Sequence, residues 1–196
     1  KEICEANNVL LIADEIQCGL GRSGRMLACD HEDVKPDGLI LGKALGGGVM
    51  PVSMFLARKD VMDIFVPGTH GSTFGGNPLA AAVGTAALNI LVEDQLADRS
   101  RDMGDYMLAE LNKIDSGLIQ DIRGAGLFIG VEIDPAKGTA REVCERLMDR
   151  GLLSKETHET VVRLAPPLII TREQIDWAIT QIREVLQEMD EVRLAS

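Results

Sequence analysis

The chain has 196 residues, of which 45% are hydrophobic and 26% charged, fractions typical of an ordinary soluble protein with a large core. Its formal net charge of −11 disfavours nucleic acids and anionic membranes as partners. No apolar run approaches transmembrane length and the first residues do not form a signal peptide, so we expect a cytoplasmic protein or, if a leader was removed, one of an organelle matrix.

The first half of the chain alternates strand-like and helical patterns. We expect strands near residues 9–16, 38–42 and 52–57, and a helix over residues 79–92. The first two are short apolar runs with β-branched residues, typical of strands buried on both faces of a parallel sheet. Asn77 is the expected N-cap of the helix, with Pro78 in its first turn.

The second half predicts a smaller, mixed α and β unit. We expect helices over 95–114, 139–150 and 172–189, a strand-rich segment over 119–133, and strands near 152–155 and 161–165. Thr171 is the expected cap of the last helix. The long helix from residue 95 predicts a boundary between a domain of residues 1–95 and a second of residues 96–196.

Asp14 and Lys43 lie at the ends of the first two predicted strands. In open α/β sheets, ligands bind outside the carboxyl ends of the strands, so these side chains are expected to meet in one crevice. A carboxylate and an amine suit pyridoxal 5′-phosphate (PLP), because the amine can bind the cofactor covalently and the carboxylate can hold the pyridine nitrogen protonated. Gly46–Gly48 permit close approach of backbone, and the polar loop 69–78 leads into a helix start that suits a phosphate.

Other sites fit the sequence less well. Residues 19–24 match the dinucleotide pattern G-x-G-x-x-G, but the charged segment 25–36 that follows does not open a helix. Asp14-Glu15 resembles a Walker B strand end, yet segment 38–44 lacks the glycine spacing and the Ser or Thr of a P-loop. The three histidines are scattered and the four cysteines form no C-x-x-C pair, so we expect no metal site and reduced thiols.

Several ordered motifs resemble the class III PLP-dependent aminotransferases. They are residues 12–17 (IADEIQ), 41–48 (LGKALGGG), 70–78 (HGSTFGGNP), 155–159 (KETHE) and 162–168 (VRLAPPL). The last two are most similar to the members that act on ornithine. The resemblance implies PLP-dependent transferase fold type I, with the chain supplying the C-terminal part of a large parallel-sheet domain and the small α+β C-terminal domain.

The resemblance also implies residue roles. Lys43 matches the lysine that binds PLP covalently, Asp14 the acid at the pyridine nitrogen, and Gln17 the residue near the phenolic oxygen. Ile16 matches an apolar residue beneath the ring, and strand alternation would place it on the same face as Asp14.

For the remaining matches, Thr73, with Ser72, corresponds to a phosphate contact given to the neighbouring subunit, which implies a homodimer with shared sites. Arg163 corresponds to the arginine that holds a substrate α-carboxylate. The residues alone also allow purely structural roles, because Ser72 and Thr73 suit a turn and Arg163 suits a strand edge.

The implied reaction passes the δ-amino group of ornithine to 2-oxoglutarate, and acetylornithine or 4-aminobutyrate are alternative donors. Family members are longer, and the resemblance places the phosphate cup and the aromatic that stacks on the ring in an N-terminal half outside this sequence. Two hypotheses therefore remain. In the first, this chain is the C-terminal part of a working aminotransferase whose other half is another segment or a companion chain. In the second, it is a non-catalytic fragment that serves as a binding or assembly module.

Overall fold

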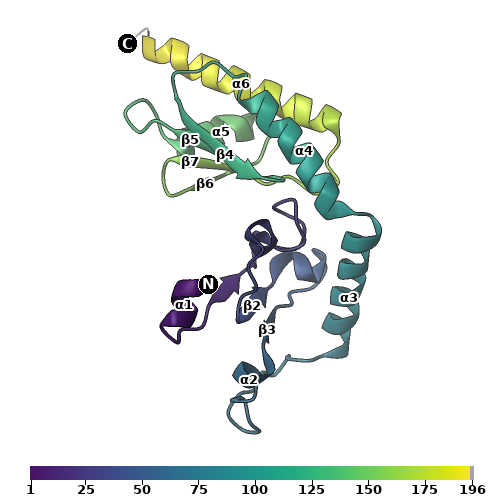
Figure 1. Ribbon diagram of the computed structural model, residues 1–196. Helices are drawn as coiled ribbons and strands as arrows, with labels where there is room; N and C mark the ends of the chain where they lie inside the picture. The colour runs from purple at the N-terminus through teal and green to yellow at the C-terminus, as the bar shows by residue number, and fades with distance from the viewer. Residues whose placement is uncertain (195–196) are drawn as a thin grey trace. The chain divides into compact units, whose positions relative to one another are not determined.

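The computed structural model describes residues 1–194, which form two compact units (Figure 1). The first unit is Lys1–Ala97 and the second begins at Asp98. Each unit has its own sheet, three-stranded in the first and four-stranded in the second. The architecture is mixed α/β, in agreement with the predicted fold class. The assignment of these units to a large and a small domain of the family remains a prediction.

The sheet of the first unit is short and has the strand order β1-β2-β3. Its strands are β1 (Ile12–Asp14), β2 (Gly38–Leu41) and β3 (Met54–Ala57). The β1–β2 pair is parallel, as expected, but β3 pairs with β2 in the antiparallel sense. The helical segments of this unit are α1 (Glu2–Ala6), η1 (Ala28–Glu32), η2 (Lys43–Gly46), α2 (Lys59–Met62) and α3 (Pro78–Glu93).

Strand β1 is shorter than predicted because part of the apolar run pairs with the residue that precedes β2. The N–H of Leu11 donates to Asp37 Oδ2 over 2.9 Å, and the Leu11 carbonyl accepts the N–H groups of Asp37 and Gly38. Asp37 is buried and also contacts Lys1 (2.6 Å) and Arg58. The Leu11 N–H and the Lys1 ammonium hold the pKa of Asp37 below its usual range.

The expected burial on both faces is wrong for β1, whose Ile12 and Asp14 are exposed, whereas β2 has Gly38 and Leu41 buried and the two residues between them half-buried. Phe55 and Leu56 of β3 are also exposed. A sheet of three strands leaves the outer edge of each outer strand without a neighbouring strand.

The second unit contains an antiparallel sheet with the order β4-β5-β7-β6. Its strands are β4 (Ile119–Ala125), β5 (Phe128–Ile133), β6 (Lys155–Thr157) and β7 (Val161–Leu164). Alternate residues of β5 and β7 are buried, because successive side chains of a strand point to opposite faces. Strand β6 begins at Lys155, the last residue of the strand predicted over 152–155.

Three helices accompany this sheet, namely α4 (Leu96–Leu111), α5 (Ala140–Asp149) and α6 (Arg172–Leu194). The predicted cap of α6 is confirmed: Thr171 Oγ1 accepts the N–H of Gln174 over 3.3 Å, and Gln174 Oε1 accepts the N–H of Thr171 over 3.0 Å. Asn77 likewise caps α3 by accepting the N–H of Ala80 over 2.8 Å.

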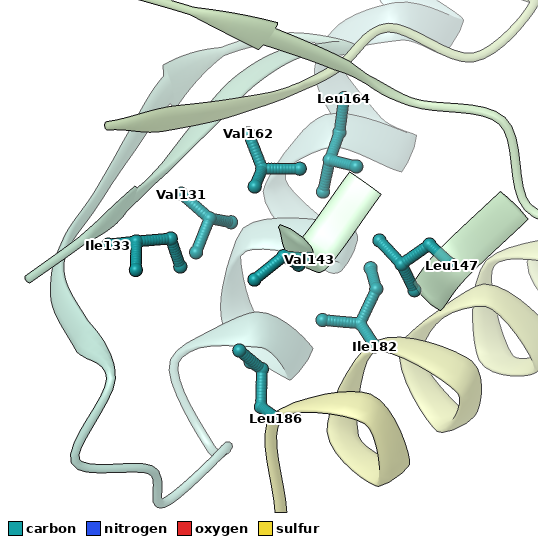
Figure 2. Close-up of a pocket in the computed structure, with 8 residues that line it drawn as sticks. All are labelled: Val131, Ile133, Val143, Leu147, Val162, Leu164, Ile182 and Leu186. Atoms are coloured by element: carbon teal, nitrogen blue, oxygen red, sulfur yellow. The ribbon is translucent and has the colours of Figure 1, made fainter. Parts of the chain in front are cut away.

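The main hydrophobic core lies within the second unit, between Met107 and Met189. Side chains from the sheet and from α5 and α6 meet there, as Figure 2 shows for eight of them: Val131, Ile133, Val143, Leu147, Val162, Leu164, Ile182 and Leu186. The apolar residues of α6 recur at the three- and four-residue spacing of one helix face. This core explains why the predicted helices of the second half form where the periodicity places them.

Within the part of the chain that the structure describes, no single helix is long and apolar enough to cross a membrane, and only the bent pair α3 and α4 passes that test together. This is weak evidence, since core helices of soluble proteins pass it too.

Replacement of Leu147 by alanine is expected to destabilise the protein by about 2–5 kcal/mol, because the side chain is fully buried and its loss leaves a cavity. Denaturant unfolding measures this cost. Met148→Ala is the matched control, since its side chain on the same helix is exposed and its loss is expected to cost about 0.5 kcal/mol or less. Equal effects of the two substitutions would contradict the described core.

Glu156 on β6 predicts a pH dependence of stability. Hydrogen bonds from Lys155 (2.8 Å), its own backbone and Arg141 (3.1 Å) lower its pKa from 4.5 to about 2. The folded state therefore gains stability from this carboxylate above pH 4.5 and loses it as the pH falls toward about 2.

We expect Glu156→Gln to lower the melting temperature near neutral pH and to match the unmodified protein near pH 2. Melting curves across this range test the prediction, with Glu191→Gln on an exposed part of α6 as the control for removal of one negative charge. A difference that does not change with pH would contradict it.

Candidate active site

The parallel pairing of β1 and β2 brings the two predicted site residues to the same end of the sheet. Asp14, the last residue of β1, lies opposite Ile40 in the register, and Lys43 follows two residues after the end of β2 at Leu41. Both side chains are therefore delivered to the carboxyl ends of parallel strands, where open α/β sheets bind their ligands. Both are exposed within this unit.

Gln17 joins the two strand ends directly. Lys43 Nζ donates a hydrogen bond to Gln17 Oε1 over 3.1 Å. The turn that carries Gln17 starts at Asp14, whose Oδ1 accepts the N–H of Ile16 over 3.1 Å. Ile16 thus lies in a turn, and the expectation that strand alternation places it on the face of Asp14 is wrong, because β1 ends at Asp14.

The backbone at Lys43 is unusual. Its φ is +45°, in the left-handed region that residues with a side chain rarely adopt. Lys43 opens the short helical turn η2, whose Leu45 is buried against α3. Gly84 of α3 lies at this contact, where an added Cβ would be in ordinary van der Waals contact with the Leu45 carbonyl oxygen at 3.6 Å. Packing of η2 on α3 thereby holds the lysine in a strained conformation, a feature that clusters at functional sites.

A cavity of the first unit extends from Lys43 to the loop that precedes α3. Ser72, Gly75, Gly76 and Asn77 line it together with Lys43. Ser72 Oγ accepts the N–H of Gly75 over 3.1 Å, which shapes the loop before the helix start. Of the two hydroxyl residues singled out in the sequence, Ser72 therefore lines the same cavity as the lysine, whereas Thr73 is not among the lining residues.

Glu15 is a site residue that sequence reasoning missed. Its carboxylate is buried, with Oε2 accepting the N–H of Ala28 over 2.7 Å and Oε1 that of Cys29 over 2.8 Å. Gly19 packs so closely that an added Cβ would lie 2.8 Å from the Glu15 carbonyl oxygen. An acid directly after a strand, with a glycine four residues on, is the only sequence signal of this arrangement.

Two thiols lie near this carboxylate. Cys18 Sγ lies 3.5 Å from Glu15 Oε2. Burial, reinforced by Glu15, raises the pKa of Cys18 and raises that of Cys29 to about 11. Because the thiolate is the reactive form, both cysteines are poor nucleophiles at neutral pH, as expected for Cys18.

Alternative ligand sites in this region gain no support. The glycines of residues 19–24 lie in turns, and the next helical segment, η1, begins only at Ala28, so the dinucleotide motif lacks the helix that it requires. Among residues 1–194, no group of three or more His, Cys, Asp or Glu side chains could hold a metal ion.

Arg163 lies in the second unit, on the face of β7 opposite to that of the buried Val162 and Leu164. It is half-buried and has a polar or electrostatic partner. Across the register, Lys155 of β6 lies directly opposite Arg163. Lys155 Nζ donates to Glu156 Oε1 over 2.8 Å, so its charge is already paired.

Comparisons with known proteins identify the relatives of this chain. Curated relatives include the ornithine aminotransferase of Halalkalibacterium halodurans, which is 59% identical over 94% of this chain and 46% of its own length. Ornithine aminotransferase 2 of Staphylococcus saprophyticus is 56% identical over 95% of this chain and 46% of its own length. The chain thus spans about half the length of these relatives.

Solved structures give the same result. An ornithine aminotransferase from Toxoplasma gondii, whose structure reveals partial PLP occupancy at its active site, matches with a TM-score of 0.94 and 46% identity over 98% of this chain and 46% of that one. The acetylornithine aminotransferase of Elizabethkingia anophelis matches with a TM-score of 0.88 and 46% identity over 95% of this chain and 48% of that one. The family model for "Aminotransferase class-III" matches residues 1–186, and this chain belongs to the class-III aminotransferase family.

Proposed function

We propose that the intact protein is a PLP-dependent aminotransferase that transfers the δ-amino group of L-ornithine to 2-oxoglutarate, giving glutamate 5-semialdehyde and glutamate. The observation that carries this proposal is the hydrogen bond between Lys43 and Gln17, because it joins the ends of two parallel strands at which Asp14 also lies. Membership of an aminotransferase family and the names of the curated relatives support it.

The residues present fit PLP. Lys43 offers an amine for the cofactor aldehyde, Asp14 a carboxylate for the pyridine nitrogen, and Gln17 an amide for the phenolic oxygen. Ser72 and Thr73, in the loop before the N-terminus of α3, are proposed to give their hydroxyls to the phosphate bound by the neighbouring subunit. Ile16, whose N–H donates to Asp14 Oδ1, is proposed as the apolar residue beneath the ring.

When bound, PLP supplies an electron-withdrawing ring that makes the C–H bond beside the transferred amino group acidic. Asp14 would stabilise the protonated ring nitrogen by placing an opposite charge beside it. Lys43 Nζ would move a proton between the substrate carbon and the cofactor. Gln17 orients this amine through the hydrogen bond that the structure describes.

Arg163 is proposed to hold the α-carboxylate of the substrates. A guanidinium offers two parallel N–H donors to a carboxylate, a geometry that lysine does not reproduce. The family resemblance of residues 162–168 supports the assignment.

A second candidate donor is acetylornithine, because the acetylornithine aminotransferase structure shares 46% identity with this chain, the same value as the Toxoplasma enzyme. Measurement of kcat/KM for both donors decides between them. A ratio that favours acetylornithine would replace ornithine in the proposal.

We also propose a homodimer with shared sites. Thr73 is not among the residues that line the cavity beside Lys43, although the neighbouring Ser72 is. The proposal rests on the family resemblance, which implies that the hydroxyls of Thr73 and Ser72 contact the phosphate in the other subunit.

Reduction with borohydride in the presence of PLP is expected to attach a phosphopyridoxyl group to Lys43, which mass spectrometry of the peptides locates. Lys43→Ala is expected to lose this label. Lys59 is the internal control, since it is exposed and paired with Asp63 rather than placed at a strand end near Asp14. Label spread evenly over surface lysines would contradict the proposal and favour a non-catalytic module.

Arg163→Lys is expected to raise KM for 2-oxoglutarate by about 10-fold or more with a smaller change in kcat, because one of two charge-assisted hydrogen bonds is lost. Steady-state kinetics test this. Arg123→Lys is the matched control, since Arg123 lies on β4 of the same sheet and pairs with Asp121 over 2.7 Å. An equal effect of both substitutions would rule out a specific role of Arg163.

A further inference from the structure

We infer that Glu15 is a positioning residue, whose buried carboxylate fixes the turn of residues 14–19 and so sets Gln17 against Lys43. The inference rests on the proposed function for its consequence in catalysis. Its geometric part concerns only side chains of the first unit. Glu15 is neither beside the reacting atoms nor exposed, and its relative exposure is 3%.

Glu15 forms hydrogen bonds through its N–H, its carbonyl and its carboxylate. Its N–H donates to the Ile40 carbonyl over 3.0 Å, which joins it to the strand that leads into Lys43. Its own carbonyl accepts the N–H of Gly19 over 3.0 Å and closes the turn. Its carboxylate accepts the N–H groups of Ala28 and Cys29 at the start of η1.

Gln17 lies inside the turn that these bonds close. The turn begins at Asp14 and is complete at Gly19, so the backbone of Gln17 is held from both sides. Gly19 leaves room for the carboxylate, since a Cβ there would lie 2.9 Å from Glu15 Oε2. Without the carboxylate, the N–H groups of Ala28 and Cys29 in η1 lose their acceptor and the turn loses its support.

The alternative is that Glu15 stabilises the fold in general, without any effect on the lysine. Asp37 provides the comparison, because it is a second buried acid of the same unit, and its partners are Leu11, Lys1 and Arg58 rather than the turn. Loss of either acid is expected to lower the melting temperature. Only loss of Glu15 should change the environment of Lys43.

The test is a mutant cycle read out on Lys43 in the intact protein without PLP. The rate of Lys43 acylation by an N-hydroxysuccinimide ester is followed by mass spectrometry. The hydrogen bond to Gln17 restricts the conformations of the Lys43 side chain, and its loss leaves Nζ more accessible to the reagent, so we expect Glu15→Gln and Gln17→Ala each to speed the reaction about 2- to 10-fold. The double variant should be no faster than either single one, because both act through the same bond.

A second variant keeps the test valid if Glu15→Gln does not fold. Ala28→Pro removes one N–H donor to the carboxylate at the first position of η1, where proline is tolerated. Leu27 already has the extended backbone that a following proline requires, with φ −123° and ψ 147°. We expect a smaller acceleration in the same direction, while Asp37→Asn leaves the Lys43 rate unchanged.

Several results would overturn the inference. They are an unchanged rate in a folded Glu15→Gln or Ala28→Pro protein, additive effects in the double variant, an unchanged rate in Gln17→Ala, and an equal acceleration in Asp37→Asn. Because the acylation needs no cofactor, these results are distinct from failure of the proposed function, which would appear as the absence of a phosphopyridoxyl label on Lys43 in the unmodified protein.

Discussion

The parallel pairing of β1 and β2 is the constraint on which the candidate site depends. Three residues of β1 pair with three of β2, and this short ladder places Asp14 beside Ile40 and brings Lys43 to the same edge. Parallel strands run in the same direction and are joined by a crossover connection. Their carboxyl ends therefore lie at the same edge of the sheet, independent of the loop sequences. The site residues thus come together because of strand direction, and the turn at residues 14–19 then fixes their contacts.

Packing of the surrounding residues offsets the backbone strain at Lys43. A left-handed backbone at a residue with a side chain costs about 1–3 kcal/mol, and only well-packed surroundings maintain it. The buried Leu45, where η2 packs on α3, supplies that packing within the first unit. The Lys43 side chain is nevertheless exposed within this unit.

Much of this arrangement could be predicted from the sequence, because the signals are local. The caps at Asn77 and Thr171 depend on residues three positions apart, and the structure confirms both. The positions of Asp14 and Lys43 follow from strand ends that hydrophobic runs mark. The same reasoning overestimated β1, since a run such as residues 9–11 does not show that Leu11 bonds to the Asp37 side chain instead of a ladder partner. Glu15 escaped prediction because its partners lie 13 and 14 residues away.

The uneven distribution of the core has a consequence for dynamics. The main cluster of buried apolar side chains lies wholly between Met107 and Met189, whereas apolar side chains of the first unit's strands, such as Ile12 and Phe55, are exposed. Local opening costs least where few apolar contacts are lost. For the chain of 196 residues alone, backbone amides of the first unit should exchange with solvent deuterium sooner than those of β5, β7 and α6. The first unit, which carries Lys43, is then the unit whose rigidity depends most on cover by other protein surface.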